Sequence, residues 1–519
     1  MKNYLMPPLE YKFLLTTTML AAATMLLATA WMGDDAFITL RVIDNLINGY
    51  GLRYNIIDRV QVFTHPLWLM ILAPIYALTR EPLITTMLVS VIMTLGALGF
   101  LAVKVAKDIK YGCLLILAAV ASRSIYQYAT SGLENPLTYL LLVLFMWQAF
   151  RADRRWIPAG IVGLLLLNRL DLAVLVGPAV AYLFFQARGT ERLRILVATT
   201  IPLLAWMSFS LVYYGAPFPN TAYAKLGTGY GATEQIMRGL EYTRDFVLHD
   251  PLLVLIIGKS LFDALCSRNW TDKMLGGGIV LYLAYIISIG GDFMSGRFYA
   301  APGFLALCIL ARSPMPQKLA NQARLATLVA IGALGMLLVA RIAEQPISVK
   351  GIADERRYYY ADTGLLPLVK DVVKTGAIHQ DHEFARHGQE LQAQARSTGV
   401  PISIWANSIG MRGYYGGPSV YIMDIFALSD AFRARLPAVP GSRIGHYVRK
   451  IPPGYFESIL DPWPATTIES LRPLLNDVTL VTRAPLFADG RWSAIWRLSS
   501  GYYNWIYREN MDSLTNLGK

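Results

Sequence analysis

The chain has 519 residues, of which 55% are hydrophobic and only 16% carry a charge. Soluble proteins of this size carry about 25% charged residues, so the composition excludes an ordinary soluble protein and indicates one that lies largely in a membrane. The formal net charge of +12 does not by itself require a nucleic-acid partner, because basic loops also orient membrane proteins.

The first apolar segment, residues 11–32, is about long enough to cross the hydrocarbon core of a bilayer. It runs directly into Gly33, Asp34 and Asp35 without a small-residue cleavage site. We therefore expect a retained helix rather than a removed signal peptide.

Further apolar blocks follow along the chain. With the first segment they predict eleven helices, at about 11–32, 82–103, 111–123, 135–150, 157–167, 172–187, 195–213, 251–267, 275–290, 298–312 and 323–341. A further apolar stretch, 66–78, has only thirteen residues. Segments of this length are often interfacial or re-entrant, and we predict that it does not span.

The charges of the connecting loops support this order of spans. The loops assigned to the cytoplasm hold 16 Lys or Arg against 5 Asp or Glu, whereas the short loops on the other side hold 10 against 12. Cytoplasmic loops carry the excess of Lys and Arg, so much of the positive charge is an orientation signal and no nucleic acid is expected as a partner. An odd number of spans places the C-terminus outside the cytoplasm.

The sequence after about residue 342 is no longer membrane-like. It contains polar stretches, turns rich in Pro and Gly, and short β-like runs at 401–405 and 420–424. The predicted fold is a polytopic α-helical membrane protein, with a transmembrane domain at 1–342 whose first outer loop is 33–81. A soluble, extracytoplasmic α/β domain follows at 343–519, which is large enough for its own core.

Polar residues collect at the predicted outer ends of the helices, where ionisable groups commonly mark function. Asp34 and Asp35 come directly after the first helix and are either solvated end-of-helix residues or a carboxylate that takes a proton from an acceptor hydroxyl. Glu134 begins another apolar helix, where the helix dipole alone could explain an acid. Arg169 and Asp171 lie between two apolar stretches and form either a local ion pair or an arginine held by its neighbour to bind a phosphate or sugar.

Two more outer loops carry candidates. In the first, residues 214–225, the prolines predict an extended, stiff loop. Its single cation, Lys225, is either a solvated loop lysine or, as the fixed framing favours, a contact to a phosphate. In the second, glycines allow close backbone approach around Asp292 and Arg297, which could also simply pair with each other. His65 opens the interfacial segment, and a single His there is more often structural than a ligand.

Metal and redox chemistry are not favoured. The adjacent Asp34 and Asp35 could contribute to a divalent-cation site, but such a site needs more oxygen ligands than two neighbours supply. No cofactor is otherwise expected. The three cysteines lie in or beside apolar segments and predict buried thiols, and the polar group around His379, His382 and His387 predicts a solvated face rather than a metal site.

At these residues the chain resembles the GT-C class of integral-membrane glycosyltransferases. Within this class it is similar to the terminal β-(1→2) arabinofuranosyltransferases of mycobacterial and corynebacterial cell walls and their relatives in other bacteria. The matching segments are Gly33-Asp-Asp-Ala-Phe-Ile-Thr39 with Arg41, Phe63-Thr-His-Pro-Leu-Trp68, Ala129-Thr-Ser-Gly-Leu-Glu134, Pro219-Asn-Thr-Ala-Tyr-Ala-Lys225, Gly290-Gly-Asp-Phe-Met-Ser-Gly-Arg297, Gly413-Tyr-Tyr-Gly-Gly-Pro418 with Asp424, and Arg443-Ile-Gly-His446.

This resemblance implies a donor of the polyprenyl-monophosphate pentofuranose type, used on the extracytoplasmic face of a bacterial inner membrane. It also implies that an aspartate of the first outer loop, Asp34 or Asp35, is central to catalysis. The residues then assigned to the donor are Arg41, His65, Glu134, Arg169, Asp171, Asn220, Tyr223, Lys225, Asp292 and Arg297. The residues assigned to the acceptor are Tyr414, Tyr415, Asp424 and His446.

The expected function is transfer of a pentofuranosyl residue, D-arabinofuranosyl by the resemblance, to an acceptor glycan. Two alternatives stay open: O-glycosylation of a surface or pilin protein with the same donor class, and a flippase or transporter of lipid-linked sugar. Transporters tend to show inverted repeats and charges near the midplane, and the sequence shows neither.

Overall fold

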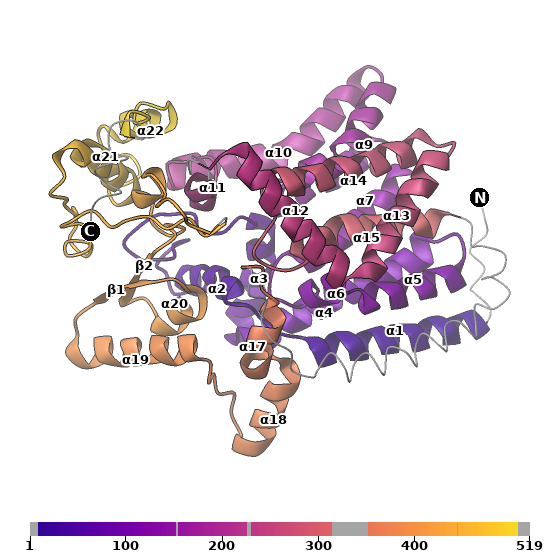
Figure 1. Ribbon diagram of the computed structural model, residues 1–519, viewed down its shortest axis with the longest axis horizontal. Coiled ribbons are helices and arrows are strands. Elements are labelled where there is room, and N and C mark those ends of the chain that lie inside the picture. The colour runs from indigo at the N-terminus through magenta and orange to yellow at the C-terminus, as the bar shows by residue number, and fades with distance from the viewer. Residues whose placement is uncertain (1–8, 152–153, 226–229, 314–350, 444, 507–519) are drawn as a thin grey trace. The chain divides into compact units, whose positions relative to one another are not determined.

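The computed structural model describes residues 9–506 except 152–153, 226–229, 314–350 and 444. Helices dominate the chain (Figure 1). The chain divides into two compact units. Unit 1 comprises residues 1–33, 81–203 and 232–379, and unit 2 comprises 34–80, 204–231 and 380–519.

Ten of the eleven predicted helices coincide with helices of the structure. Those that belong to unit 1 are α1 (Leu9–Thr29), α4 (Leu83–Phe100), α5 (Ile109–Ala121), α7 (Asn135–Ala149), α8 (Trp156–Asn168), α9 (Leu172–Gln186), α13 (Pro251–Cys266), α14 (Trp270–Ser288) and α15 (Arg297–Arg312), while α10 (Thr190–Tyr213) continues from unit 1 into unit 2. The predicted helix at 323–341 and the predicted domain boundary at 342/343 lie outside the described residues.

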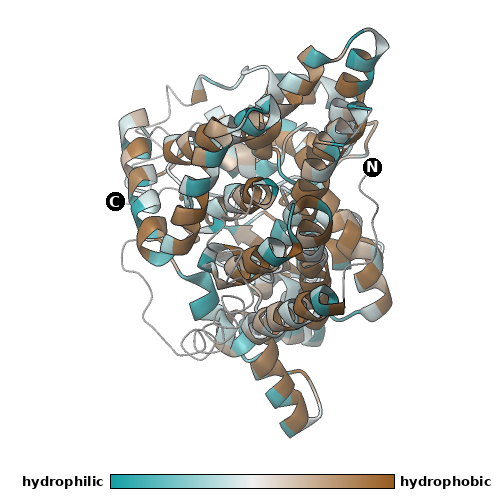
Figure 2. Cartoon of the chain, turned by 90° about the vertical axis from the view of Figure 1, so that its right-hand side faces the viewer, coloured by the Kyte–Doolittle hydropathy of each residue, from teal (hydrophilic) through white to brown (hydrophobic). Residues whose placement is uncertain are grey.

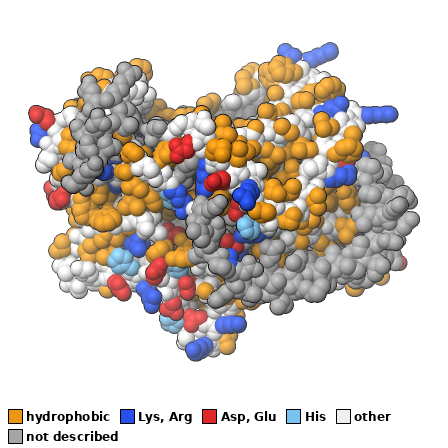
Figure 3. All heavy atoms as spheres, viewed as in Figure 1, with side chains coloured by type: hydrophobic (Ala, Val, Ile, Leu, Met, Phe, Trp, Pro, Cys, Tyr) orange, Lys and Arg blue, Asp and Glu red, His pale blue; other side chains and the backbone are white. Residues whose placement is uncertain are grey.

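Three of the described helices are long and apolar enough to cross a membrane: α1, α4 with the π-helical turn η1 (Leu101–Val105), and α10. Five more apolar helices have 10–17 residues, which is short for a hydrocarbon core of about 30 Å. The predicted number of eleven spans therefore stays a prediction. Brown apolar residues predominate along the helices of Figure 2, and an apolar surface with Lys and Arg at its right-hand end occupies the upper right of Figure 3.

The structure adds helices that the apolar pattern did not reveal. Besides the short α6 (Arg123–Tyr128), α17 (Glu355–Thr363) and α18 (Leu365–Thr375), unit 1 contains α12 (Ala232–His249), inside a predicted loop. Unit 2 contains α2 (Asp34–Ile47), inside the predicted first outer loop. Both α2 and α12 alternate polar with apolar residues around the helix, so a search for continuous apolar blocks misses them.

The interfacial segment predicted at 66–78 forms a helix, α3 (Pro66–Thr79). Proline suits the first turn of a helix because its missing N–H would have no partner there. The helix ends at Arg80, whose φ of 53° places it in the left-handed conformation that terminates many helices.

Unit 2 also contains both predicted strands. The strands β1 (Ile402–Ala406) and β2 (Val420–Asp424) pair in parallel, from Ile402 opposite Val420 to Ala406 opposite Asp424. All five residues of β2 are buried, as in a strand covered on both faces. The remaining elements of unit 2 are α11 (Asn220–Lys225), α19 (Glu383–Thr398), α20 (Gly410–Gly416), η2 (Arg433–Arg435), η3 (Glu469–Leu471), α21 (Arg472–Thr482) and α22 (Arg491–Ser499).

Candidate active site

Five of the predicted donor residues meet in unit 1, although they come from three separate stretches of chain. Glu134 lies at the centre, with its Oε1 3.6 Å from a guanidinium nitrogen of Arg169 and 3.4 Å from one of Arg297. Asp171 pairs with Arg169, and Asp292 Oδ2 lies 3.6 Å from Arg297. We call these five residues the arginine cluster.

Arg169 is the more rigidly held of the two arginines. Its Nε and NH2 donate to the two carboxylate oxygens of Asp171 at 3.1 and 2.6 Å, and NH2 lies 3.2 Å from the Tyr282 hydroxyl. The Tyr282 hydroxyl also donates to Asp171, and the ring of Phe298 lies 5.2 Å from the guanidinium carbon. NH1 of Arg169 is buried and has no hydrogen-bond acceptor among the described residues.

The cluster lies where three helices begin. Glu134 and Asp171 are the N-cap residues of α7 and α9, and Arg297 is the first residue of α15. The free N–H groups and the dipoles of helix N-termini favour negative charge, which accounts for the two acidic caps and adds to the attraction that two arginines exert on an anion. Arg297 is the less enclosed cation, with 14% of its side chain exposed against 5% for Arg169.

Glycines allow the turn before α15 to pack closely, as the sequence predicts. A Cβ on Gly291 would lie 2.4 Å from the ring of Tyr242, and one on Gly296 would lie 2.5 Å from the hydroxyl of Ser124. Both glycines also have a positive φ, 70° and 74°, which other residues rarely adopt.

The two adjacent aspartates of unit 2 lie in different environments. Asp34, 7% exposed, accepts the backbone N–H of Gly410 at 2.8 Å and of Met411 at 2.7 Å, one with each carboxylate oxygen. Burial raises the pKa of Asp34, and the two N–H donors oppose that rise. Asp35 is half-buried. Asp34 therefore links the start of α2 to the start of α20 through its two hydrogen bonds. The side chain of Asp35 is partly exposed to solvent.

Gly410 is required by this contact. A Cβ there would lie 1.7 Å from the backbone oxygen of Asp34. We expect Gly410→Ala to lower the stability of the protein by about 1–3 kcal/mol, as overpacking of a tight contact does. The measurement is thermal unfolding of the purified variant, with Gly399→Ala as the control. A Cβ on Gly399 would meet nothing within 4 Å, so this substitution adds only the backbone strain of a positive φ. An equal loss in both variants would contradict the tight contact.

Arg41 and His65 lie in unit 2, and both side chains form hydrogen bonds with other residues of that unit. Arg41 is buried, donates to the backbone oxygens of Tyr54 at 2.7 Å and Val420 at 2.6 Å, and stacks over the Tyr54 ring. His65 precedes α3 and its Nε2 lies 2.9 Å from the Thr39 hydroxyl. These contacts are those of residues that position α2 and α3, and their assignment to the donor stays a prediction.

The segment around Lys225 differs from the prediction. The expected extended loop is wrong, because Asn220–Lys225 forms the helix α11; Pro219 immediately precedes this helix, where proline is tolerated. Asn220 donates to the backbone oxygens of Ala427 and Leu428 at 2.8 and 2.9 Å. Lys225 itself is exposed, as a phosphate contact requires.

The predicted acceptor residues fall into two groups. Tyr414 and Tyr415 of α20 are half-buried, and both pack against the ring of Phe37. The Tyr414 hydroxyl lies 2.7 Å from that of Tyr76, which donates to Asp44 at 2.8 Å.

The other two acceptor residues, Asp424 and His446, are more enclosed. Asp424 is fully buried and accepts the backbone N–H groups of Phe426 and Leu428. Burial, reinforced by the positive charges of Arg443 and Lys225, lowers the pKa of His446 to about 3, so this side chain is neutral at pH 7.

Burial also raises the pKa of Asp424 to about 7 from an ordinary value of 3.8, against the opposing effect of its two N–H donors. The protonated acid is therefore favoured in the folded state, and its contribution to stability is present below pH 3.8 and is lost as pH rises through about 7. We expect the unfolding temperature to fall between pH 5 and pH 8, with a shallower fall in Asp424→Asn. Identical slopes in both proteins would contradict this.

Comparison with known proteins supports the predicted resemblance. No protein-family model matches the chain. The terminal β-(1→2)-arabinofuranosyltransferase of Mycobacterium tuberculosis is 27% identical over 80% of this chain and 80% of its own length. The enzyme of the same name from Corynebacterium glutamicum is also 27% identical, over 84% of this chain and 76% of its own. The chain resembles the terminal β-(1→2)-arabinofuranosyltransferases.

The fold agrees with this resemblance. The crystal structure of ArnT from Cupriavidus metallidurans bound to undecaprenyl phosphate matches 80% of this chain and 85% of its own, with a TM-score of 0.52 and 13% sequence identity. ArnT is a GT-C glycosyltransferase, so the chain has a GT-C fold. Together the relatives support glycosyltransferase activity in a multi-pass membrane protein.

The structure brings together residues that the sequence did not single out. Tyr282, in the middle of the apolar helix α14, completes the hydrogen bonding of Arg169 and Asp171. Asp44 and Tyr76 continue the chain of hydroxyls from Tyr414. A tyrosine within an apolar helix gives no signal by itself, whereas Asp44 could have been found from the polar face of α2.

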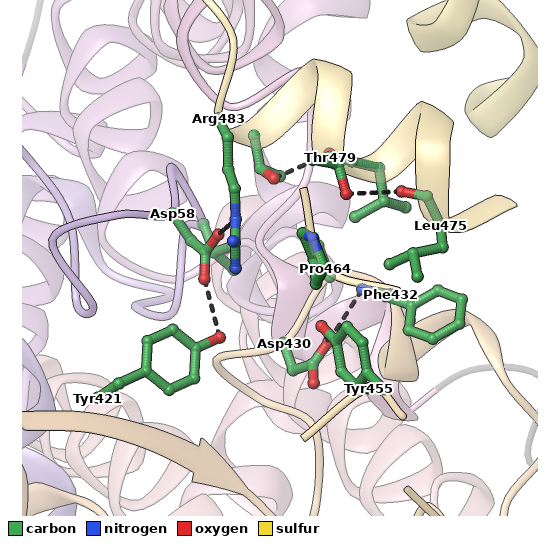
Figure 4. A pocket seen from close by; sticks show the side chains of 13 residues that line it. Asp58, Tyr421, Asp430, Phe432, Tyr455, Pro464, Leu475, Thr479 and Arg483 are labelled. Carbon is green, nitrogen blue, oxygen red and sulfur yellow. Dashed lines mark hydrogen bonds and ion pairs between the residues drawn. The ribbon is translucent and has the colours of Figure 1, made fainter. Parts of the chain in front are cut away.

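A small polar cavity in unit 2 is distinct from these residues (Figure 4). Asp58, Asp430, Tyr421, Tyr455 and Arg483 are among the residues that line it, and its volume is about 10 Å³. Oδ2 of the buried Asp430 has no hydrogen-bond partner among the described residues. A cavity of this size holds about one water molecule, which would satisfy that oxygen, and it cannot hold a sugar.

Among the described residues, no group of three or more His, Cys, Asp or Glu side chains is placed to hold a metal ion. The predicted solvated face around His379 is partly wrong, because His382 is buried and its Nδ1 accepts the N–H of Phe384 as the N-cap of α19. Cys113 and Cys308 are buried as expected, but Cys266, at the end of α13, is exposed.

Proposed function

We propose that the chain transfers a pentofuranosyl residue, D-arabinofuranosyl, from a polyprenyl monophosphate to an acceptor glycan on the extracytoplasmic face of a bacterial inner membrane. The names of the two relatives support the sugar and the reaction. The undecaprenyl phosphate in the ArnT crystal structure supports the donor class. The arginine cluster is the observation in this chain that carries the proposal.

The arginine cluster suits the phosphate of such a donor. The leaving group is a phosphate monoester anion, and stabilising the charge that develops on it is usually the largest catalytic contribution. Arg169 is preorganised by Asp171 and Tyr282, and its NH1 is a donor that no described residue satisfies with a hydrogen bond. Arg297 is the more accessible guanidinium and begins α15, at the positive end of that helix dipole, whereas Arg169 is the C-cap of α8, two residues before the N-cap of α9.

Asp35 is the better candidate for the general base. Both carboxylate oxygens of Asp34 accept backbone N–H groups, which makes Asp34 a positioning residue for α2 and α20. Asp35 is more exposed and is the second residue of the same helix, next to Asp34.

The proposed reaction is a displacement at the anomeric carbon. The acceptor oxygen forms a bond to that carbon, the bond from the carbon to the phosphate oxygen breaks, and its electron pair leaves with the polyprenyl phosphate. The hydroxyl proton passes to the Asp35 carboxylate, which also stabilises positive charge on the sugar ring in the transition state.

We assign binding of the acceptor glycan to Tyr414 and Tyr415, and we add Asp44, which the structure places in the same hydrogen-bonded chain. Half-buried aromatic rings offer flat apolar faces to a sugar while keeping their hydroxyls for hydrogen bonds. Asp44 accepts from Tyr76 with one oxygen, and its second oxygen is suited to a sugar hydroxyl.

The test is transfer by the purified protein in nanodiscs. Polyprenyl-phosphoryl D-arabinofuranose with a radiolabelled sugar is offered with arabinan oligosaccharides and, separately, with a surface protein acceptor. We expect label to move to the oligosaccharide. Label on the protein would instead establish the O-glycosyltransferase alternative, and donor that crosses a bilayer without any transfer would establish a flippase.

A further inference from the structure

A cavity in the described part of unit 1 lies at the opposite end of α15 from the arginine cluster. Its volume is about 300 Å³. The lining residues come from the ends of α13 and α15, the start of α14 and the turn before α5: Lys107, Lys259, Asp263, Cys266, Ser267, Asp272, Ile309, Arg312 and Ser313. Arg297 and Arg312 are the first and last residues of the sixteen-residue α15, so the two places are separated by about 22 Å of helix.

The residues that line this cavity include three cations and two acids. Lys259 pairs with Asp263, and Arg312 pairs with Asp272 at 3.4 Å. Lys107 is exposed, and within the described residues it has no acidic partner, while its backbone N–H is fixed to Ala311 at 2.9 Å. The lining therefore has one net positive charge, carried by an ammonium group that is available to a ligand.

Hydroxyl groups and a held guanidinium complete the lining. The Ser267 hydroxyl donates to Asp272 at 2.8 Å, which leaves the carboxylate occupied on both oxygens. Arg312 stacks its guanidinium carbon 3.1 Å from the centre of the Phe150 ring. Asp263 and Asp272 thus both accept hydrogen bonds from side chains of the protein. Lys107 is the lining cation that can bind an external anion.

Exposed apolar side chains lie on α13 and α14, two of the helices whose ends line the cavity. On α13 the residues Phe262 and Leu265 are 61% and 75% exposed, between lining residues of the same helix, and Trp270 at the start of α14 is 56% exposed. Large apolar side chains at such exposure in a membrane protein face lipid, and Trp is enriched at the membrane interface. The helix ends that line the cavity therefore also carry apolar side chains suited to contact with acyl chains.

We propose that this cavity binds the phosphate of an anionic phospholipid headgroup, with Lys107 as the principal contact. Basic pockets between transmembrane helices commonly bind such headgroups. The lining includes residues from three stretches that the sequence assigns to the cytoplasm, namely Lys107, Asp272, and Arg312 with Ser313, so the lipid would be one of the inner leaflet. The alternative source of the same chemistry is a soluble phosphate, which would not need the exposed apolar side chains of α13 and α14.

The test uses the purified full chain in phosphatidylcholine nanodiscs with increasing phosphatidylglycerol. Lipid retained by the protein is counted by native mass spectrometry, and thermal unfolding is followed in parallel. We expect one tightly held phosphatidylglycerol per chain and a saturating rise in the unfolding temperature. Lys107→Glu should weaken this binding at least about tenfold, the scale of one lost charge-assisted contact, and Lys104→Glu, an exposed lysine of the same turn, should leave it unchanged.

Three results would overturn the proposal. Equal effects of Lys107→Glu and Lys104→Glu would reduce the interaction to general surface electrostatics. An equal rise in unfolding temperature with inorganic phosphate or glycerol 3-phosphate would assign the cavity to a soluble anion. Full lipid retention by Lys107→Gln, which keeps the shape of the side chain and guards against misfolding of the charge-reversed variant, would exclude Lys107 as the contact.

Discussion

Replacement of Asp35 by Asn is expected to lower sugar transfer by about 10²- to 10⁴-fold, the usual contribution of a positioned general base. The variant should fold, because Asn keeps the size of the half-buried Asp35 side chain and leaves the two hydrogen bonds of Asp34 to α20 in place. Donor binding should stay near that of the wild type, since the phosphate contacts are assigned to other residues. The measurements are turnover with purified lipid donor, donor affinity and thermal unfolding of the same preparations.

Asp34→Asn is the matched variant. An amide offers only one acceptor where the carboxylate satisfies two backbone N–H groups, so one of these groups would face an NH₂ group. We expect a loss of stability of about 1–3 kcal/mol, the cost of an unsatisfied buried group, with transfer reduced through the displacement of α2. Wild-type turnover in Asp35→Asn, with complete loss in a stable Asp34→Asn, would reverse the two roles.

Replacement of Arg297 by Gln is expected to raise the KM for the lipid donor about 10- to 100-fold. This range corresponds to about 1.5–3 kcal/mol for a hydrogen bond to a charged group. Arg297 is the more exposed guanidinium of the arginine cluster, so its loss disturbs the buried Arg169–Asp171 pair least. Steady-state kinetics with varied donor at saturating acceptor measure the effect.

The control for this variant is Arg244→Gln, which removes an exposed arginine from α12 in the same unit. It should leave both constants unchanged. Arg297→Lys, which retains the charge but not the planar fork, should recover part of the donor affinity. An unchanged KM in Arg297→Gln would exclude the phosphate contact.

The continuous apolar blocks were enough to locate ten helices, because a lipid-facing or buried helix is apolar on most of its surface. The same criterion missed α2 and α12, whose apolar residues occupy only one face. The prolines before Asn220 predict an extended segment that continues to Lys225. Proline, however, restricts only its own position and the residue before it, and the helix α11 begins directly after Pro219.

The arginine cluster could be predicted only in parts. The pairing of Arg169 with Asp171 follows from their spacing of two residues, but their link to Glu134 and Arg297 depends on how α7, α8 and α15 pack. Asp34 and Asp35 are chemically identical in the sequence. The structure distinguishes them by burial and by the backbone N–H groups of Gly410 and Met411, 376 and 377 residues from Asp34, which no local pattern reveals.

The most direct measurement of the central claim is the stoichiometry between sugar transferred and polyprenyl monophosphate released in one reaction. Doubly labelled donor, with one isotope in the sugar and the other in the phosphate, lets both products be counted. The proposed displacement predicts one polyprenyl monophosphate for each sugar on the acceptor, and a rate of formation of both products lower by about 10²- to 10⁴-fold in Asp35→Asn. Sugar transfer without release of the lipid monophosphate, or equal yields from Asp35→Asn, would contradict it.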